Sequence, residues 1–563
     1  MNRTALALTL LLALLSSAVA GILLVNLIES PKVAAQPTEQ EVIHKEIKIM
    51  PDGSFVVDYL CDNGTYVYDT NPKVPISRNV FGNYYTFTGD VYGHLVIERD
   101  NIVVDGAGHK LQLEGYRSFA ISAGIRDRAH SNTEFVGTEN VVITNMVIED
   151  LGYGIELAGS NNVVSGVTLK GGGDSNTKAI WDSGSNNIIR ECRIVETGGT
   201  GIYVAGSGAI ISDNYIAGNG AAGIEFHSSA VTLRNNELLN NRQAFDFDTL
   251  PSASNSVDSS NTVDGKPVYC WVDEHDKTVP TEAGYVLLNN CTNVIVQGIS
   301  VLNGSDNIAR NSNGIYLYST KDSFIERNCL QAGPGVKIGG SCQNITIIEN
   351  YVGSGGISLT SSSNVSVTNN YVQPSGISLG GTTKCLIAGN TLKRCFVGLS
   401  LRAAYENRIL QNNIAECDTG INIFKSDENV FSGNNFVSNE QNVWEQHYTF
   451  EWPSNRYHES VNNIWDGNYW SNYTGTDRDS DGVGDIPHIV YEDKKDNYPF
   501  MSAFVIPEII PEPVDSSTSP TPTAAGTSLL SWENASVVVV AVVVILVVMC
   551  TGLLVYFKKR KKP

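Results

Sequence analysis

The stretch GIYVAGSGAIISDNYIAGNGAAGIEF, residues 201–226, contains the pattern that decides the fold. A small residue followed by an apolar one stands at Gly201-Ile202 and again 22 residues later at Gly223-Ile224. A period of this length, kept over most of the chain, indicates a solenoid. In two runs separated by residues 225–313, such pairs recur at intervals of 20 to 25 residues, at Gly154-Ile155, Ala179-Ile180, Gly314-Ile315, Gly335-Val336, Gly356-Ile357, Gly376-Ile377, Gly398-Leu399 and Gly420-Ile421.

The apolar residues within each repeat alternate with a period of two. Ile202 and Val204 flank Tyr203, and Ile357 and Leu359 flank Ser358. This spacing is typical of short strands and disfavours helical solenoids. The leucine-rich repeat signature is absent, and Gly, Ser, Thr and Asn occupy the corners. We therefore predict an all-β chain whose coils of about 20–25 residues form a right-handed parallel β-helix.

A second periodic feature is a series of Asn residues at the expected turns. Asn tolerates the left-handed backbone conformation, and stacked Asn amides form hydrogen bonds along the stacking axis. This structural role is favoured over a ligand-binding one. Cys192 occupies the same position 22 residues before Asn214 and is expected to be a buried thiol. The series consists of Asn214, Asn236, Asn350, Asn370, Asn390, Asn413 and Asn435.

Both ends of the chain have the composition of membrane-targeting segments. Residues 1–35 contain Arg3 and a long apolar run, and we expect a signal peptide or signal anchor, with cleavage after Ala20 or near Ala35. Residues 536–557 are long enough for a transmembrane helix, and the basic tail 558–563 is expected to stay in the cytoplasm. The Pro-, Ser- and Thr-rich segment 507–535 then forms an extended stalk.

The exported part divides further by composition. We expect an N-terminal β region and cap at 36–100, a first part of the β-helix at 101–250 and an insertion between coils at 251–285. The second part of the β-helix is expected at 286–440 and a Trp-rich C-terminal cap at 441–506. Trp444, Trp452, Trp465 and Trp470 are expected to cover the open hydrophobic end of the solenoid.

The net charge of −21 disfavours nucleic acid as a partner. Ten Cys occur without a CxxC pair, which disfavours a zinc ribbon. Cys395 and Cys417 each precede the Gly of a repeat by three residues, so we expect them to stack one coil apart as a disulfide or as two thiols. Sequons predict glycosylation at Asn63, Asn290, Asn303, Asn344, Asn364, Asn472 and Asn534.

Three stretches resemble a known family: YTFTGDVYGHLVIERDNIVVDGAGHKLQ from Tyr85, NTVDGKPVYCWVDE with VPTEAGYVLLNNCTNVIVQ, and GNYWSNYTGTDRDSDGVGDIPHIV with DNYPFM. The chain resembles NosD-type parallel β-helix proteins, within the class of carbohydrate-binding and sugar-hydrolysing β-helix domains. The resemblance implies copper binding by family name. Copper prefers grouped His, Cys or Met, whereas the nine His residues are scattered. We expect a single-pass membrane protein of an archaeon or bacterium with its β-helix outside the cell.

The acidic run DRDSDGVGD is the strongest local signal for a metal. Alternating carboxylates converge on hard cations, and Gly482 permits the turn. The twelfth position is His488 where an EF-hand has Glu, so we expect a static, structural calcium loop and not a helix-loop-helix sensor. Its expected Ca²⁺ ligands are Asp477, Asp479, Asp481 and Asp485.

Residues just after the apolar anchors form a predicted outward row. Aromatic faces stack on sugar rings and carboxylates bind hydroxyls, so Glu156, Trp181, Tyr203 and Glu225 are candidates for glycan binding. Glu156 and Glu225 are three coils, about 14 Å, apart, beyond the roughly 5–9.5 Å between paired glycosidase carboxylates. We favour binding of polysaccharide or envelope components without catalysis. The alternatives are a polysaccharide lyase, hydrolase or epimerase, with Glu156, Asp182, Glu225 and His227 as catalytic candidates, and a copper-related role.

Overall fold

The computed structural model describes residues 42–61, 66–113, 119–125, 136–150, 152–247, 252, 254–301, 313–446 and 460–507. The predicted signal segment, transmembrane helix and basic tail, almost all of the stalk, Trp452, and the sequons at Asn63, Asn303 and Asn534 lie outside these residues. Within the described ranges, no helix has the length and apolarity that crossing a bilayer requires. The membrane anchor therefore stays a prediction.

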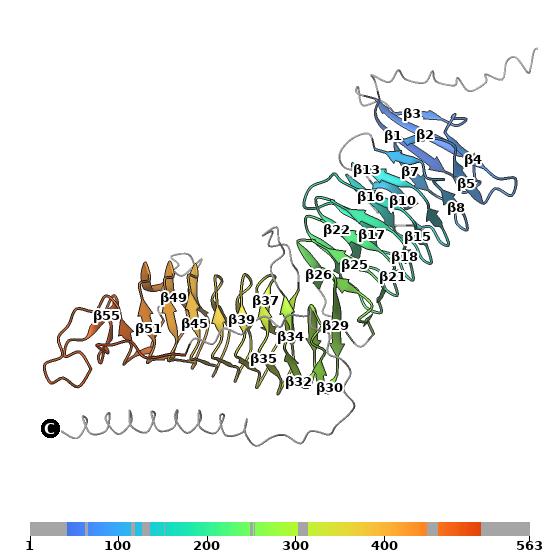
Figure 1. Ribbon diagram of the computed structural model, residues 1–563. Coiled ribbons are helices and arrows are strands. Elements are labelled where there is room, and N and C mark those ends of the chain that lie inside the picture. Colours follow the sequence, from blue (N-terminus) through green and yellow to red (C-terminus); the bar gives the residue numbers. More distant parts are fainter. Residues whose placement is uncertain are drawn as a thin grey trace, which may run out of the picture. The chain divides into compact units, whose positions relative to one another are not determined.

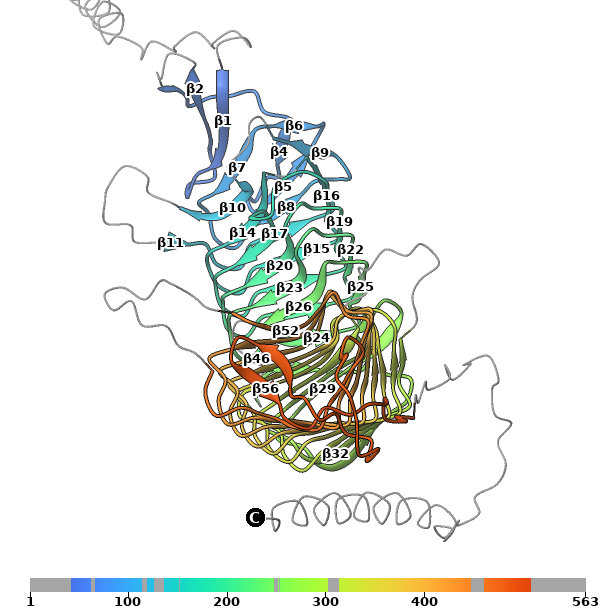
Figure 2. The same cartoon turned by 90° about the vertical axis from the view of Figure 1, so that its left-hand side faces the viewer.

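The described residues form stacked coils of short strands, and the predicted all-β right-handed parallel solenoid is confirmed (Figures 1 and 2). Strands of successive coils pair in parallel, in two consecutive halves. In the N-terminal half, the first sheet contains β1 (Val42–Ile49), β7 (His94–Ile97), β10 (Phe119–Ile125), β14 (Tyr153–Leu157), β17 (Lys178–Asp182), β20 (Thr200–Val204), β23 (Ala222–Phe226) and β26 (Gln243–Phe247).

Two more sheets complete the coils of this half. The second contains β4 (Ile76–Arg78), β5 (Tyr84–Phe87), β8 (Val103–Asp105), β12 (Val142–Thr144), β15 (Val163–Ser165), β18 (Ile188–Arg190), β21 (Ile210–Ser212), β24 (Thr232–Arg234) and β27 (Ser256–Val257). The third contains β6 (Val91–Tyr92), β9 (Lys110–Gln112), β13 (Val147–Glu149), β16 (Thr168–Lys170), β19 (Arg193–Val195), β22 (Tyr215–Ala217), β25 (Glu237–Leu239) and β28 (Thr262–Val263).

The C-terminal half repeats the arrangement. Its first sheet contains β29 (Lys266–Val272), β31 (Tyr285–Asn289), β34 (Gly314–Tyr318), β37 (Gly335–Gly339), β40 (Ile357–Thr360), β43 (Ile377–Gly380), β46 (Val397–Arg402), β49 (Thr419–Phe424) and β52 (Gln441–Glu445). The second contains β30 (His275–Val279), β32 (Thr292–Gln297), β35 (Phe324–Glu326), β38 (Thr346–Ile348), β41 (Ser366–Thr368), β44 (Leu386–Ala388), β47 (Arg408–Leu410), β50 (Val430–Ser432) and β53 (Ile464–Trp465). The third contains β33 (Ser300–Val301), β36 (Cys329–Leu330), β39 (Tyr351–Val352), β42 (Tyr371–Val372), β45 (Thr391–Lys393), β48 (Asn413–Ala415), β51 (Asn435–Val437) and β54 (Tyr469–Trp470).

The two halves meet at a reversal of the chain. β28 pairs antiparallel with β29 across the turn Asp264-Gly265, where both residues have positive φ. β31 faces both halves: Tyr285 and Leu287 join the N-terminal core, whereas Val286 and Leu288 join the C-terminal one. The segment 251–285, expected as an insertion, thus supplies strands that pair with coils on either side.

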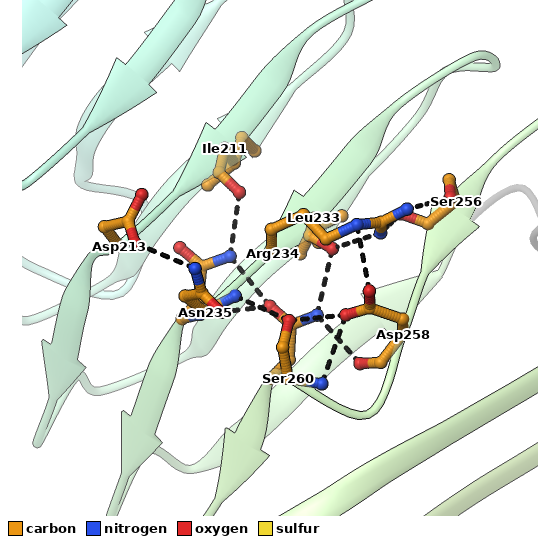
Figure 3. Close-up of polar contacts among 10 residues, drawn as sticks. Ile211, Asp213, Leu233, Arg234, Asn235, Ser256, Asp258 and Ser260 are labelled. Carbon is orange, nitrogen blue, oxygen red and sulfur yellow. Dashed lines mark hydrogen bonds and ion pairs between the residues drawn. The ribbon is translucent and has the colours of Figure 1, made fainter.

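Polar side chains also tie together the last coils of the N-terminal half (Figure 3). Arg234 forms an ion pair with Asp258, with Nε and Oδ2 2.9 Å apart, and its guanidinium donates to the carbonyl of Ser256. One coil apart, the Asn235 amide donates to Asp213 at 3.0 Å. These contacts hold polar side chains in place on the outer surface of the coils, outside the apolar core.

Antiparallel strands cover the first coil. β1 pairs in parallel with β7 and antiparallel with β2 (Phe55–Cys61), which pairs with β3 (Tyr66–Asp69). In the coils that follow, β10 also pairs antiparallel with β11 (Val136–Gly137). An open β-helix end exposes unpaired backbone groups and core side chains, so such a cap keeps the first coil from pairing with other chains.

The other end is closed by aromatic stacking and one buried carboxylate. Trp465 stacks on Phe431 and Trp470 on Phe436, with ring centroids 3.9 and 4.2 Å apart, which agrees with the expected cap. Asp496 accepts hydrogen bonds from the Trp470 indole and from backbone N–H groups. It lies in the hairpin of β55 (His488–Tyr491) and β56 (Lys494–Asp496). Trp444 does not take part, because it lies 44% exposed on the outside of β52.

The expected Asn ladder is present but differs in two details. In the C-terminal half it runs through Asn412 and Asn434, not through the expected Asn413 and Asn435. The ladder Asn residues are also not left-handed; the residue before each one has positive φ, for example Asn369 before Asn370. Each ladder side chain bonds the next coil, and the C-terminal series is Asn328, Asn350, Asn370, Asn390, Asn412, Asn434 and Asn468.

Cysteines take the places expected of small apolar residues. Cys192 is buried at a ladder position, and its N–H donates to Asn214. Cys395 and Cys417 are free thiols in contact, which is the second of the two predicted outcomes. The hydrogen bond with the Cys417 thiol, together with burial, raises the pKa of Cys395. Both thiols are therefore packing groups in this structure.

Candidate functional site

The outer row of the first N-terminal sheet has the predicted register. Trp181 pairs with Glu156 in the coil before and with Tyr203 in the coil after, and Tyr203 pairs with Glu225. The row continues to Asp246 on β26. Because neighbouring coils are only about 4.8 Å apart, these side chains form one continuous strip.

Aromatic rings connect the strip along the stacking direction. Phe119 lies 5.1 Å from Tyr153 and 5.8 Å from Trp181, between ring centroids. Trp181 lies 5.3 Å from Tyr203, which lies 4.8 Å from the His227 imidazole. All five side chains are half-buried. They present ring edges and faces to solvent while packing holds them in place, as in many sugar-binding surfaces.

A polar cluster lies at the end of the aromatic strip. One oxygen of Glu225 accepts hydrogen bonds from Lys178 at 2.7 Å and Thr200 at 2.8 Å. The other lies 3.0 Å from Nε2 of His227. Lys178 also lies over the Tyr203 ring, 4.9 Å from its centroid, a cation–π distance. The cluster and the aromatic strip therefore share residues and form a single surface.

The Glu225 carboxylate is held in its charged form. Burial alone raises the pKa of Glu225, but the hydrogen bonds from Lys178, His227 and Thr200 outweigh it and lower the pKa below the ordinary value. A general acid needs a proton to donate near neutral pH, whereas this group has lost its proton well below that range. Glu225 is thus better suited to bind hydroxyls or cationic groups than to protonate a leaving group.

Two sequence-predicted residues are not available on this surface. Glu156 has the expected register, but it is 1% exposed and accepts a hydrogen bond from Ser122 at 2.8 Å. Asp182 points inward, in line with Leu157 and Val204, because it comes one residue after the outward Trp181. Asp182 is fully buried, and desolvation raises its pKa to about 6 despite hydrogen bonds from Asn187 and Gly184. Neither of these two catalytic candidates is thus presented on the outer surface.

Sequence reasoning missed Lys178 and Thr200. The two residues pair with each other and lie two positions before the apolar anchors Ile180 and Ile202. Strict alternation places a residue two positions before an inward anchor on the inward face as well, and Thr200 is 1% exposed. The period-two pattern therefore does not mark these residues as part of an outer surface. Their contact with Glu225 requires side-chain reach across coils, which the repeat pattern does not specify.

The acidic loop brings together three of its four predicted ligands. Oxygens of Asp477, Asp479 and Asp481 lie within 4.8 Å of one another. Asp485 is not in this group, and its carboxylate accepts the N–H of Arg478, inside the same loop, at 2.8 Å. The Asp477 carboxylate already accepts N–H groups of Asp481 and Gly482, so the loop satisfies part of its own charge. Oxygen ligands of this kind suit a hard cation such as Ca²⁺.

The copper expectation finds no matching donor set among the described residues. Among the described residues, the acidic loop is the one place where three or more His, Cys, Asp or Glu side chains lie close enough together to hold one ion. Copper prefers imidazole and sulfur donors, and carboxylates alone suit harder cations. These residues do not fit a copper site.

Four of the predicted glycosylation sites lie in the described residues, and all four are exposed. The amides of Asn290 and Asn344 donate to neighbouring Asp side chains at 2.6 and 2.8 Å. Asn364 and Asn472 are the other two. Their positions on outer turns are compatible with a bulky modification.

Two family models match the chain. Residues 100–264 match the model described as a right handed beta helix region, and residues 260–475 match that of the periplasmic copper-binding protein (NosD). The candidate surface at Phe119–His227 lies in the first of these ranges, whereas the acidic loop at 477–485 begins two residues after the end of the second.

Two curated relatives share part of the sequence. Both are named probable ABC transporter binding protein NosD. The one from Stutzerimonas stutzeri is 38% identical over 105 residues, which is 18% of this chain and 21% of that protein. The one from Pseudomonas aeruginosa is 35% identical over 108 residues, 18% of this chain and 22% of that protein. The chain thus spans about a fifth of the length of the curated relatives it matches.

Solved structures align over more of the chain at low identity. The A-module of the mannuronan C-5 epimerase AlgE6 from Azotobacter vinelandii is 14% identical, covering 68% of this chain and 92% of that one, with a TM-score of 0.24. A tailspike protein of an E. coli bacteriophage in complex with pentasaccharide is 12% identical, covering 64% and 74%, with a TM-score of 0.32. These TM-scores assign no function. By its family matches, the chain combines a right-handed β-helix region at residues 100–264 with a NosD-type region at residues 260–475.

Proposed function

We propose that the outer face of the first N-terminal sheet binds polysaccharide or envelope glycan. The observation that carries this proposal is the continuous strip from Phe119 through Trp181 and Tyr203 to His227, joined to the Lys178–Glu225 pair. Rings spaced along successive coils match the repeating pyranose units of an extended chain, and charged groups beside them select hydroxyl patterns. The ligand therefore runs along the stacking direction.

Two of the aligned structures are of proteins that act on or bind sugar polymers. The aligned structures include an epimerase that acts on mannuronan and a tailspike in complex with pentasaccharide. They are similar to this chain in fold only, so the proposal rests on the surface itself. Membrane anchoring by residues 536–557 would place that surface outside the cell.

A polysaccharide-modifying activity is the second candidate, and one observation favours it. Glu225 is hydrogen-bonded to both Lys178 and His227, so one cluster holds a carboxylate, an amine and an imidazole. These are the group types that proton transfer at a sugar carbon requires. Glu225 pairs in register with exposed Asp246, which brings two carboxylates into neighbouring coils.

A polysaccharide panel separates the two candidates. The purified full-length chain in detergent is tested for retention of neutral, acidic and amino-sugar polymers, and each retained polymer is analysed for shortened or altered chains. Binding without product, lost in Trp181→Ala, supports the first candidate. Product formation that disappears in Glu225→Gln supports the second. A panel without any retained polymer contradicts both.

A further inference from the structure

Two arginines converge on a single glycine in the N-terminal cap. Arg78 is the last residue of β4, and Arg99 follows β7 by two residues. A Cβ atom on Gly53 would lie 2.0 Å from Nη1 of Arg99 and 2.6 Å from Nη1 of Arg78. Gly53 also has a φ of +85°. The position therefore suits glycine, and the two guanidinium groups lie beside each other above it.

The surroundings neutralise these two charges only in part. Arg78 donates to the carbonyl oxygen of Gly53 at 2.5 Å, and the Tyr85 hydroxyl donates to the same oxygen at 3.3 Å. Asp52 is the nearby acid, but one of its oxygens is engaged by Ser54. Those Ser54 hydrogen bonds, and more weakly the two arginines, lower the pKa of Asp52. Among the described residues, neither arginine forms an ion pair with a carboxylate.

A cavity opens beside Arg78. It has a volume of about 480 Å³ and is lined by Asp52, Gly53, Ser54, Phe55, Thr70, Asn71, Pro72 and Arg78. Arg99 contacts the same Gly53 turn and does not line the cavity itself. The volume exceeds that of a single oxyanion group and leaves room for a larger molecule that carries one.

The donor set defines the kind of group that fits. Each guanidinium offers five N–H donors in a planar fork and no acceptor. Such forks bind carboxylate, sulfate and phosphate oxygens through paired hydrogen bonds. Two adjacent cations repel each other, and an anion between them removes that repulsion. In a chain with a net charge of −21, this local pair of positive charges contrasts with the rest of the surface.

We propose that Arg78 and Arg99 bind an oxyanion, the carboxylate, sulfate or phosphate group of an acidic ligand, at the Gly53 turn. This site lies in the N-terminal cap and is separate from the aromatic strip, so it does not depend on glycan binding there. Arg78 donates one N–H to the backbone and keeps its other donors, so both arginines supply donors to the ligand.

Direct binding of small probes tests the site. Sulfate, phosphate and glucuronate are titrated separately into the full-length chain in detergent at low ionic strength, by isothermal calorimetry. We expect saturable binding of at least one probe, weakened tenfold or more in Arg99→Gln and less in Arg99→Lys, which keeps the charge. Arg394→Gln is the matched control, since Arg394 is an exposed arginine in the C-terminal half. Its binding curve is expected to equal that of the parent.

Chemical protection of the parent chain gives a second readout that needs no variant. Phenylglyoxal modifies arginines, and mass spectrometry of peptides reports each position. The bound probe is expected to slow modification of Arg78 and Arg99 but not of Arg394. The proposal is overturned if no probe binds, if Arg99→Gln binds as tightly as the parent, or if the probe protects neither arginine.

Discussion

The outer rows of the two halves have the same parallel register and differ in the chemistry of their middle coils. In the N-terminal half, the row runs from Trp181 through Tyr203 to Glu225. In the C-terminal half, the position after the apolar anchor is Tyr316, then Lys337, followed by Ser358, Ser378 and Ser400 and, in the last coils, Asn422 and Trp444. Coil stacking needs only the inward residues and the backbone ladder, so it imposes neither set. The C-terminal row thus has small polar residues in its middle coils, whereas the N-terminal row has Trp181, Tyr203 and Glu225 in successive coils.

The inner Asn ladder is present in both halves and differs in length. In the C-terminal half it continues from Asn328 to Asn468, whereas in the N-terminal half it runs from Asn214 through Asn236 to Asn261, with Cys192 at the position before Asn214. The unbroken ladder lies within the region that matches the NosD model, and the aromatic strip lies outside it. The surface that we propose to bind glycan thus lies outside the region that matches the NosD model.

The largest expected effect comes from breaking the C-terminal ladder. Asn370 Oδ1 accepts from both the backbone N–H and the side chain of Asn350. In Asn370→Ala, these two buried donors lose their acceptor, at about 1–3 kcal/mol each, so we expect a loss of about 2–6 kcal/mol in unfolding free energy. Urea denaturation measures it. The control Ser378→Ala, on the outer row, should stay within about 0.5 kcal/mol of the parent.

Calcium is expected to stabilise the C-terminal cap through the acidic loop. The loop is tied to the cap because Gly484 donates to Pro499 and Met501 donates to Gly482. At free calcium a hundredfold above the dissociation constant, linkage gives about 2.7 kcal/mol. Thermal unfolding is compared with calcium and with chelator. If calcium does not shift the unfolding transition of the parent, the loop binds no stabilising calcium. If calcium shifts the transition of the double variant Asp479→Asn, Asp481→Asn as much as that of the parent, the calcium site lies elsewhere in the chain.

The inward Asp182 is expected to make the N-terminal half sensitive to pH. The pKa of Asp182 is raised from 3.8 to about 6 in the folded protein. The stability that the neutral side chain allows is therefore fully present below about pH 4 and is lost as the pH rises through 6, because the buried carboxyl group then loses its proton. At pH 7 the charged form costs about 2–3 kcal/mol. Asp182→Asn should therefore raise stability at pH 7 and flatten the slope between pH 4 and 7. Urea denaturation at several pH values measures this slope of unfolding free energy against pH. If Asp182→Asn keeps the slope of the parent, Asp182 is not the group that causes it.

The smallest expected effect is a loss of ligand affinity in a variant of the outer row. Trp181→Ala removes one ring of the strip, and we expect a loss of affinity of about tenfold, or 1.4 kcal/mol, for the polysaccharide that the panel selects. Trp444→Ala is the matched control, since Trp444 is an outer-row tryptophan of the C-terminal half. Equal losses in both variants would show that the two halves do not differ as surfaces.

The repeat predicted the fold because each coil repeats one physical requirement, an apolar pair inside and a polar turn outside. It placed Trp181, Tyr203 and Glu225 in one row for the same reason. It failed at Asn413, where a ladder shifted by one residue keeps almost the same period. It also failed for Asp182 and Lys178: a buried carboxylate and a contact between long side chains depend on local packing that period alone does not encode.

Hydroxyl-radical footprinting of the full-length chain, with and without the selected polysaccharide, tests the central claim most directly. Radicals oxidise exposed aromatic side chains, and mass spectrometry reads each position. We predict that the ligand protects Trp181, Tyr203 and His227 and leaves Tyr316 and Trp444 of the C-terminal half unchanged. Protection of Trp444 with full oxidation of Trp181 would contradict the assignment of binding to the N-terminal half.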